Sequence, residues 1–171
     1  MNRLSLVAAA FGLLASSTLS ATTLSDDANM TIQFELPQLD VAQYARPYVA
    51  IWLENSDRES VRTITLWTGK QTEWLKDIRS WWRKVGRYDA EFADALSGAT
   101  RPAGQYRVEW DGKDDNGQLV PAGEYTLMTE VVREHGGRDL VRMPITLGDA
   151  PFTQSSEAQD EIGVISLSYQ P

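Results

Sequence analysis

The chain has 171 residues, of which 24 are acidic, 16 are basic and none is cysteine. Without cysteine, the chain cannot form a disulfide, a thiolate metal site or the acylated cysteine of a lipoprotein. The excess of acidic residues disfavours nucleic acid as a partner, because phosphate binding depends on clustered Lys and Arg. Composition therefore indicates an acidic protein whose fold is stabilised by its hydrophobic core, without disulfides.

The first 21 residues have the pattern of a secretory signal peptide. Arg3 precedes an apolar run from Leu4 to Leu14, and small and polar residues follow as far as Ala21. The run is too short for a permanent membrane anchor, which needs roughly 20 apolar residues. We therefore expect cleavage near Ala21, export to the periplasm, and a single domain over residues 22–171.

Seven segments have the short, apolar or alternating pattern of β-strands. In Thr31–Leu36, for example, apolar and polar residues alternate and Pro37 ends the run. Residues 148–160 are polar and contain proline, so we expect a long loop there. The pattern predicts a mainly β fold, an immunoglobulin-like antiparallel β-sandwich of about seven strands. The expected strands cover residues 31–36, 48–53, 61–67, 105–110, 124–133, 139–147 and 162–169.

Between the third and fourth expected strands, the sequence predicts a helical insertion at about residues 72–97. Apolar residues recur there at spacings of three and four with charged residues between them, which is typical of an amphipathic helix. A second short helix is expected over Asp89–Leu96, capped by Asp89 and ended by Gly98 in a left-handed conformation. The apolar positions of the first helix are Trp74, Leu75, Ile78, Trp81, Trp82 and Val85.

The stretch Asp94-Ala95-Leu96-Ser97-Gly98-Ala99-Thr100 resembles the acceptor motif of exported flavoproteins. In that motif an Asp and two free positions precede Ser or Thr, Gly, Ala and Thr, and an FMN transferase esterifies the last threonine with FMN. The resemblance implies covalent FMN on Thr100. Gly98 and Ala99 leave room for a phosphate, and Arg101 is suited to pair with it, although it could equally face water. The expected cofactor site comprises Thr100, Asp94, Ser97, Gly98, Ala99, Arg101 and Trp82.

The motif also has a plainer interpretation, in which Gly98 ends a helix and Thr100 begins the next strand. The aromatic residues nearby are open to two interpretations as well. The flavin ring could stack on Trp82, Tyr88 or Phe92. Core packing is the favoured alternative, because a helix that lies on a sandwich needs a buried apolar face.

Residues 110–126 resemble the hairpin of the immunoglobulin-like domain in flagellar hook-capping proteins. Asn116-Gly117, Pro121 and Gly123 supply the turn chemistry, and Tyr125 resumes a strand. This resemblance bears on the fold and not on an activity.

Taken whole, the chain resembles a family of predicted periplasmic proteins called domain of unknown function 2271. The resemblance covers most of residues 30–147, and its features are the strand ending in Trp67, the Trp-rich helix at 74–83, the exit at 97–104 and the hairpin at 110–125. It implies an association with FMN transferases and with membrane proteins of the PepSY type. An association with these proteins implies extracytoplasmic electron transfer, connected to iron or haem reduction.

No other group of residues in the sequence predicts a catalytic or metal site as well as the motif predicts a flavin site. His135 is the single histidine, so a Ser-His hydrolase is poorly supported and a multi-histidine zinc site is excluded. Residues 111–116 miss the EF-hand calcium spacing, because Lys113 falls at a ligand position. The leading hypothesis is a periplasmic flavinylated electron carrier that works with a PepSY-type or other haem or flavin redox partner, rather than a stand-alone enzyme. The alternatives are an immunoglobulin-like binding or assembly module without a cofactor, and a metal or haem chaperone.

Overall fold

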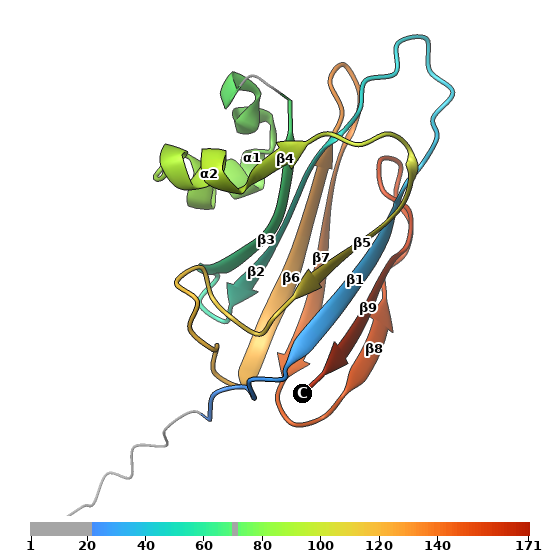
Figure 1. The fold of residues 1–171 in the computed structure, drawn as a ribbon. Helices are drawn as coiled ribbons and strands as arrows, with labels where there is room; N and C mark the ends of the chain where they lie inside the picture. Colours follow the sequence, from blue (N-terminus) through green and yellow to red (C-terminus); the bar gives the residue numbers. More distant parts are fainter. Residues whose placement is uncertain (1–21, 70–71) are drawn as a thin grey trace, which may run out of the picture.

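The computed structural model describes residues 22–69 and 72–171, which form two facing β-sheets with a helical layer outside one of them (Figure 1). The strands are β1 (Asn29–Leu36), β2 (Tyr48–Asn55), β3 (Ser60–Thr68), β4 (Ser97–Ala99), β5 (Gly104–Trp110), β6 (Gly123–Val132), β7 (Arg138–Leu147), β8 (Phe152–Ser155) and β9 (Ile165–Gln170). The four-stranded sheet has the order β5-β1-β9-β8, and the five-stranded sheet has the order β4-β3-β2-β6-β7. Among these strands, β3 and β4 form the one parallel pair.

All seven expected strands are present, so the prediction of a mainly β sandwich is confirmed. Two further strands, β4 and β8, are additions to the expected set. β8 lies inside the segment 148–160, so the expectation of a loop is wrong for residues 152–155. The polar sequence of β8 has no apolar alternation to reveal it. Its strand conformation comes instead from pairing with β9 at the edge of the sheet.

The connectivity is that of an immunoglobulin-like sandwich. The hairpins β2-β3 and β6-β7 share one sheet and β1 and β5 share the other, as strands C, C′, F and G and strands B and E do in that fold. β9 pairs with β1 on the side away from β5, so the C-terminal strand takes the position of the usual first strand. Near the start of β6, the hydroxyl of Tyr125 donates a hydrogen bond of 2.8 Å to the Pro121 carbonyl, which matches the tyrosine corner of these domains.

The main core lies between the two sheets. Side chains alternate along β1, so Met30, Ile32, Phe34 and Leu36 all point inward and are buried. Apolar residues of β2, β6, β7 and β9 complete this core. Each large buried apolar side chain contributes roughly 1.5–3 kcal/mol, so a core of this size can stabilise a cysteine-free chain.

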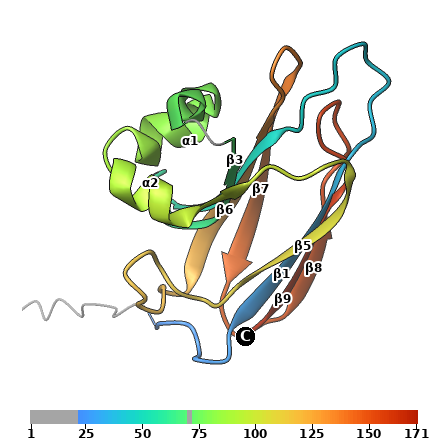
Figure 2. The same cartoon turned by 45° about the horizontal axis from the view of Figure 1, so that its top comes forward.

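The helical insertion lies outside the five-stranded sheet (Figure 2). A second core fills the space between the insertion and the outer face of that sheet. Trp52 of β2 and Leu66 of β3 point outward to this core, where Ile78 and Trp81 of the insertion cover them. The indole of Trp81 also donates a hydrogen bond of 3.0 Å to the side chain of Thr63 on β3. Trp81 therefore has the packing role that the amphipathic pattern favours.

The insertion is not the single amphipathic helix that its spacing predicts. It comprises the 3₁₀ helix η1 (Thr72–Asp77), the one-turn helix α1 (Arg79–Trp81), the π-helix η2 (Trp82–Gly86) and the helix α2 (Ala90–Leu96). The buried carboxylate of Glu130 accepts the N–H groups of Ser80 and Trp81, which fixes a new helix start at that point. Contacts with the sheet, which the local sequence does not reveal, therefore divide the insertion.

Candidate functional site

The flavin-like motif begins on α2 and ends just beyond β4. Asp89 caps α2 as predicted, since its carboxylate accepts the Phe92 N–H at 2.8 Å. Asp94 is exposed, and its carboxylate makes no hydrogen bond or ion pair with any residue that the structure describes. The hydroxyl of Ser97 donates to the Asp94 carbonyl at 3.1 Å at the end of the helix. The acidic side chain at the head of the motif is thus available to a partner protein.

Gly98 lies in the middle of β4, opposite Trp67 of β3. Its φ is not positive, and the helix ends at Leu96, followed by Ser97 in an extended conformation with φ −70° and ψ 132°. The expectation that Gly98 ends the helix in a left-handed conformation is therefore wrong. Pairing with β3 draws the residues after α2 into a strand, and this long-range contact overrides the local preference of glycine.

Thr100 follows β4 directly. Its backbone N–H donates a hydrogen bond of 3.1 Å to the Thr68 carbonyl, so the chain stays tied to β3 as far as this residue. The residue is half-buried, and its hydroxyl makes no hydrogen bond within the described part of the chain. Gly98 and Ala99 before it are exposed. The structure thus presents a free hydroxyl, with small neighbours, at the edge of the five-stranded sheet.

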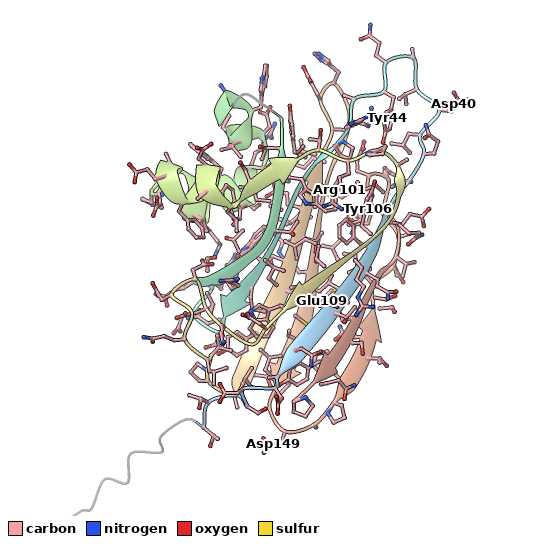
Figure 3. All side chains as sticks on the ribbon, in the orientation of Figure 1. Asp40, Tyr44, Arg101, Tyr106, Glu109 and Asp149 are labelled. Carbon is pink, nitrogen blue, oxygen red and sulfur yellow. The ribbon has the colours of Figure 1, made fainter. Side chains whose placement is uncertain are left out.

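Arg101 lies over two aromatic rings where the chain crosses from β4 to β5. Its guanidinium carbon is 4.4 Å from the ring centroid of Trp67 and 5.5 Å from that of Tyr106. Figure 3 shows Arg101, on this crossover, beside Tyr106 of β5. The Tyr106 hydroxyl donates a hydrogen bond of 2.6 Å to the Pro102 carbonyl, which anchors the far end of the crossover. Arg101 is exposed, yet the rings hold it in place by cation–π attraction.

Trp67 supports Arg101 from the margin of the main core. Its ring centroid lies 5.4 Å from that of Phe34 and 5.1 Å from that of Tyr106, and 5% of the residue is exposed. Sequence reasoning missed Trp67 and Tyr106 as neighbours of the motif. Only the pairing of β3 with β4 and the crossover to β5 bring them there, and no local pattern signals either event.

In the described part of the chain, the rings that contact Arg101 are not those of the three stacking candidates. Trp82 is half-buried and packs against the second core. Tyr88 and Phe92 line a groove of about 750 Å³ that also reaches Ser60, at the start of β3. The motif pairs with the opposite end of β3, so the rings that contact Arg101 belong instead to β3 and β5.

The remaining candidates are turns. The Asp114 carboxylate accepts the N–H groups of Asn116 and Gln118 at 2.9 and 2.8 Å, and Gly117 has φ 77°, so the acidic hairpin stabilises its own turn. His135 is exposed at the tip of the β6-β7 hairpin, with φ 56°. Within the residues that the structure describes, no three His, Cys, Asp or Glu side chains are grouped so as to hold a metal ion.

Across residues 22–69 and 72–171, none of the helices has the length and apolar character needed to cross a membrane. Residues 29–164 match the sequence family described as predicted periplasmic protein, DUF2271. No curated protein and no solved structure matches the chain. The family match includes the whole flavin-like motif, and its description agrees with the predicted periplasmic location. The expected signal peptide lies outside the described residues.

Proposed function

We propose, on the premise that this chain belongs to the DUF2271 family of predicted periplasmic proteins, that Thr100 carries covalent FMN and that the protein transfers electrons outside the cytoplasm. The observation that carries this proposal is the position of Thr100. Its hydroxyl is free, its preceding neighbours Gly98 and Ala99 are exposed, and it lies at a sheet edge. A modifying protein can therefore reach the hydroxyl without unfolding the sandwich.

The surroundings of Thr100 fit a phosphate-linked group. β4 is the outermost strand of its sheet and only three residues long, so one side of its backbone is open to a transferase. Asp94, which has no partner within the described residues, can contact the transferase or a metal ion bound there. Gly98 and Ala99 keep bulk away from the approaching phosphate.

The proposed attachment uses FAD as the flavin donor. The Thr100 side-chain oxygen attacks the phosphorus of the FMN half, the phosphoanhydride bond breaks and AMP leaves, and the hydroxyl proton passes to a base on the transferase. No electrons are gained or lost in this step. Once bound, FMN supplies one- and two-electron redox chemistry, while the chain sets its exposure and the charge around it.

The proposed role is that of an electron carrier rather than a self-sufficient enzyme. An FMN transferase would load it, and a membrane redox protein of the PepSY type, or another haem or flavin protein, would exchange electrons with it. The exposure of Gly98 and Ala99 beside Thr100 supports this role, because a carrier must present its redox group to a partner. The acidic surface leaves a positively charged protein face as the complementary docking partner.

The intact mass of the exported protein, made together with an FMN transferase, tests the attachment. We expect a mass increase equal to FMN less one water, which Thr100→Ala abolishes. Thr153→Ala changes an exposed threonine on β8 and should leave the increase intact. An unmodified mass, with a transferase that is active on another acceptor, would overturn the proposal and favour an immunoglobulin-like binding module without a cofactor.

A further inference from the structure

We infer that the Arg101 guanidinium and the Trp67 indole N–H form a phosphate site beside Thr100, which holds the phosphodiester of the attached FMN. The natural ligand in this inference rests on the proposed function. The site itself belongs to the folded chain, so it takes inorganic phosphate in the absence of flavin.

Arg101 supplies the positive charge of the site. Its guanidinium carbon lies over the Trp67 ring, 4.4 Å from the centroid, and its N–H groups donate to no residue that the structure describes. No carboxylate among the described residues pairs with it. The backbone is anchored on both sides, by the Thr100 N–H bond to Thr68 and by the Tyr106 bond to the Pro102 carbonyl. The cation is thus held in position before any anion binds.

The indole N–H of Trp67 is the second donor, and it donates to no residue that the structure describes. Buried polar groups are normally paired, and the indoles of Trp52, Trp81 and Trp110 donate hydrogen bonds of 2.7 to 3.0 Å. Only 5% of Trp67 is exposed, but the nitrogen itself is not fully enclosed by protein atoms. Solvent therefore reaches this N–H, and an anion beside Thr100 can replace water as its acceptor.

Gly98 leaves this donor uncovered. A β-carbon on Gly98 would lie 3.4 Å from Cδ1 and 3.9 Å from Nε1 of Trp67, so the missing side chain opens the edge of the indole. Side chains two residues apart in an extended strand share a face, which directs Thr100 to the same side as Gly98. A phosphate ester on Thr100 therefore starts beside both donors.

Charge reinforces this geometry. A phosphodiester is a monoanion, and the formal net charge of the chain is −8, so an attached phosphate needs a local cation. Arg101 is the residue directly after the attachment point, and its planar fork matches two phosphate oxygens. The indole N–H would then add a neutral donor to the same group.

Unmodified protein tests the site first, with inorganic phosphate as the probe. Each indole N–H gives its own cross-peak in a proton–nitrogen NMR spectrum, and the peak lost in Trp67→Phe identifies Trp67. If that variant does not fold, sequential assignment identifies the same peak. Phosphate should move this peak saturably, whereas sodium chloride at equal ionic strength should not.

Arg101→Gln and Gly98→Ala test the two donors separately, and Arg107→Gln is the control. Arg101→Gln should weaken phosphate binding about tenfold or more, because a charged hydrogen-bonding partner is lost. Arg107→Gln changes an exposed arginine paired with Glu109 and should leave binding unchanged. In Gly98→Ala the new methyl group fits at an ordinary contact distance and covers the indole edge, so the Trp67 peak should respond less while the fold persists.

The test is completed by recording the same spectrum on protein that intact mass shows to carry FMN. Its Trp67 peak should already be displaced and should no longer respond to phosphate, because the diester occupies the site. A peak that moves no more with phosphate than with chloride, or that moves equally in Arg101→Gln, would overturn the inference. Loaded protein that still titrates like unmodified protein would overturn the link to flavin. A phosphate response without loading would support the site and remove the proposed function instead.

Discussion

The buried carboxylate of Glu130, on β6, accepts a hydrogen bond of 2.9 Å from the backbone N–H of Ser80 in the insertion. The same carboxylate accepts the Trp81 N–H at 3.1 Å and lies 2.7 Å from the Arg138 guanidinium. A helix start has N–H groups without partners in its own helix, and here a charged side chain of the sheet satisfies two of them. Glu130 thus joins the helical insertion to the sandwich.

Glu130→Gln should lower the free energy of unfolding by about 2–3 kcal/mol, since hydrogen bonds to a buried charged acceptor are stronger than neutral ones. Urea denaturation followed by tryptophan fluorescence measures this change. Glu109→Gln is the matched control, because it removes an exposed carboxylate that pairs with Arg107 and should cost less than about 1 kcal/mol. Equal losses in the two variants would contradict the capping role.

Tyr125→Phe tests the tyrosine corner. At neutral pH the variant should lose about 1 kcal/mol of stability, because the hydrogen bond to Pro121 is removed. Burial raises the pKa of Tyr125 above the ordinary tyrosine value, so the folded state favours the neutral hydroxyl. The contribution of the neutral Tyr125 hydroxyl to the free energy of unfolding is complete below the unfolded-state pKa of about 10. It is lost as pH rises through the higher folded-state pKa.

Urea unfolding of the wild type and of Tyr125→Phe, from about pH 8 to about pH 11, measures this dependence. The difference between the two proteins should shrink at the alkaline end of the range. Comparison of the pair cancels the ionisation of Tyr48 and Tyr169, whose pKa values burial also raises. A difference that grows with pH would contradict the assignment.

The strands of the sandwich could be predicted from the sequence, because the alternation of apolar and polar residues that marks a strand is a local pattern. β1 alternates strictly, and its apolar residues Met30, Ile32, Phe34 and Leu36 are the ones that are buried. The turn residues of the β5-β6 connection were equally visible, and Gly117 has the positive φ that its turn needs. Where one residue and its near neighbours decide the structure, the sequence predicts it.

The features that sequence reasoning missed depend on contacts between distant residues. Leu75, Ile78 and Trp81 are buried as the helical spacing predicts, but Trp74 is exposed. The Glu130 carboxylate, from a distant strand, fixes a new helix start at Ser80. Gly98 looked like a helix end, and the pairing of β4 with β3 made it part of a strand. The rings that contact Arg101 were missed for the same reason, because they belong to β3 and β5, which precede and follow the motif in the chain.

Gly86→Ala should destabilise the insertion by about 1–3 kcal/mol, the usual cost of forcing extra volume into a packed core. The added β-carbon would lie 2.5 Å from Cε3 of Trp82 and 2.6 Å from Cζ3 of Trp81, and Trp81 is fully buried and unable to move aside cheaply. Near-ultraviolet circular dichroism and urea unfolding report the displaced indoles. Gly148→Ala is the control, because its new methyl group meets no atom within 4 Å. If both variants unfold alike, the packing against Gly86 is not a constraint.

Asp94→Asn separates recognition of the motif from stability of the fold. Because the Asp94 carboxylate makes no hydrogen bond or ion pair within the described residues, the free energy of unfolding should change by less than about 0.5 kcal/mol. Loading by an FMN transferase should nevertheless fall about tenfold, since the charged contact with the transferase or its metal ion is lost.

The loading rate of Asp94→Asn is measured by intact mass over time, beside Glu91→Gln as a control. Glu91 is an exposed acid on the same helix but outside the motif, so its replacement should leave the rate unchanged. Full loading of Asp94→Asn would exclude Asp94 from recognition. A large loss of stability in that variant would show that the carboxylate serves the fold instead. Slow loading on an intact fold is the result expected of a recognition residue, because its contacts form only with the transferase.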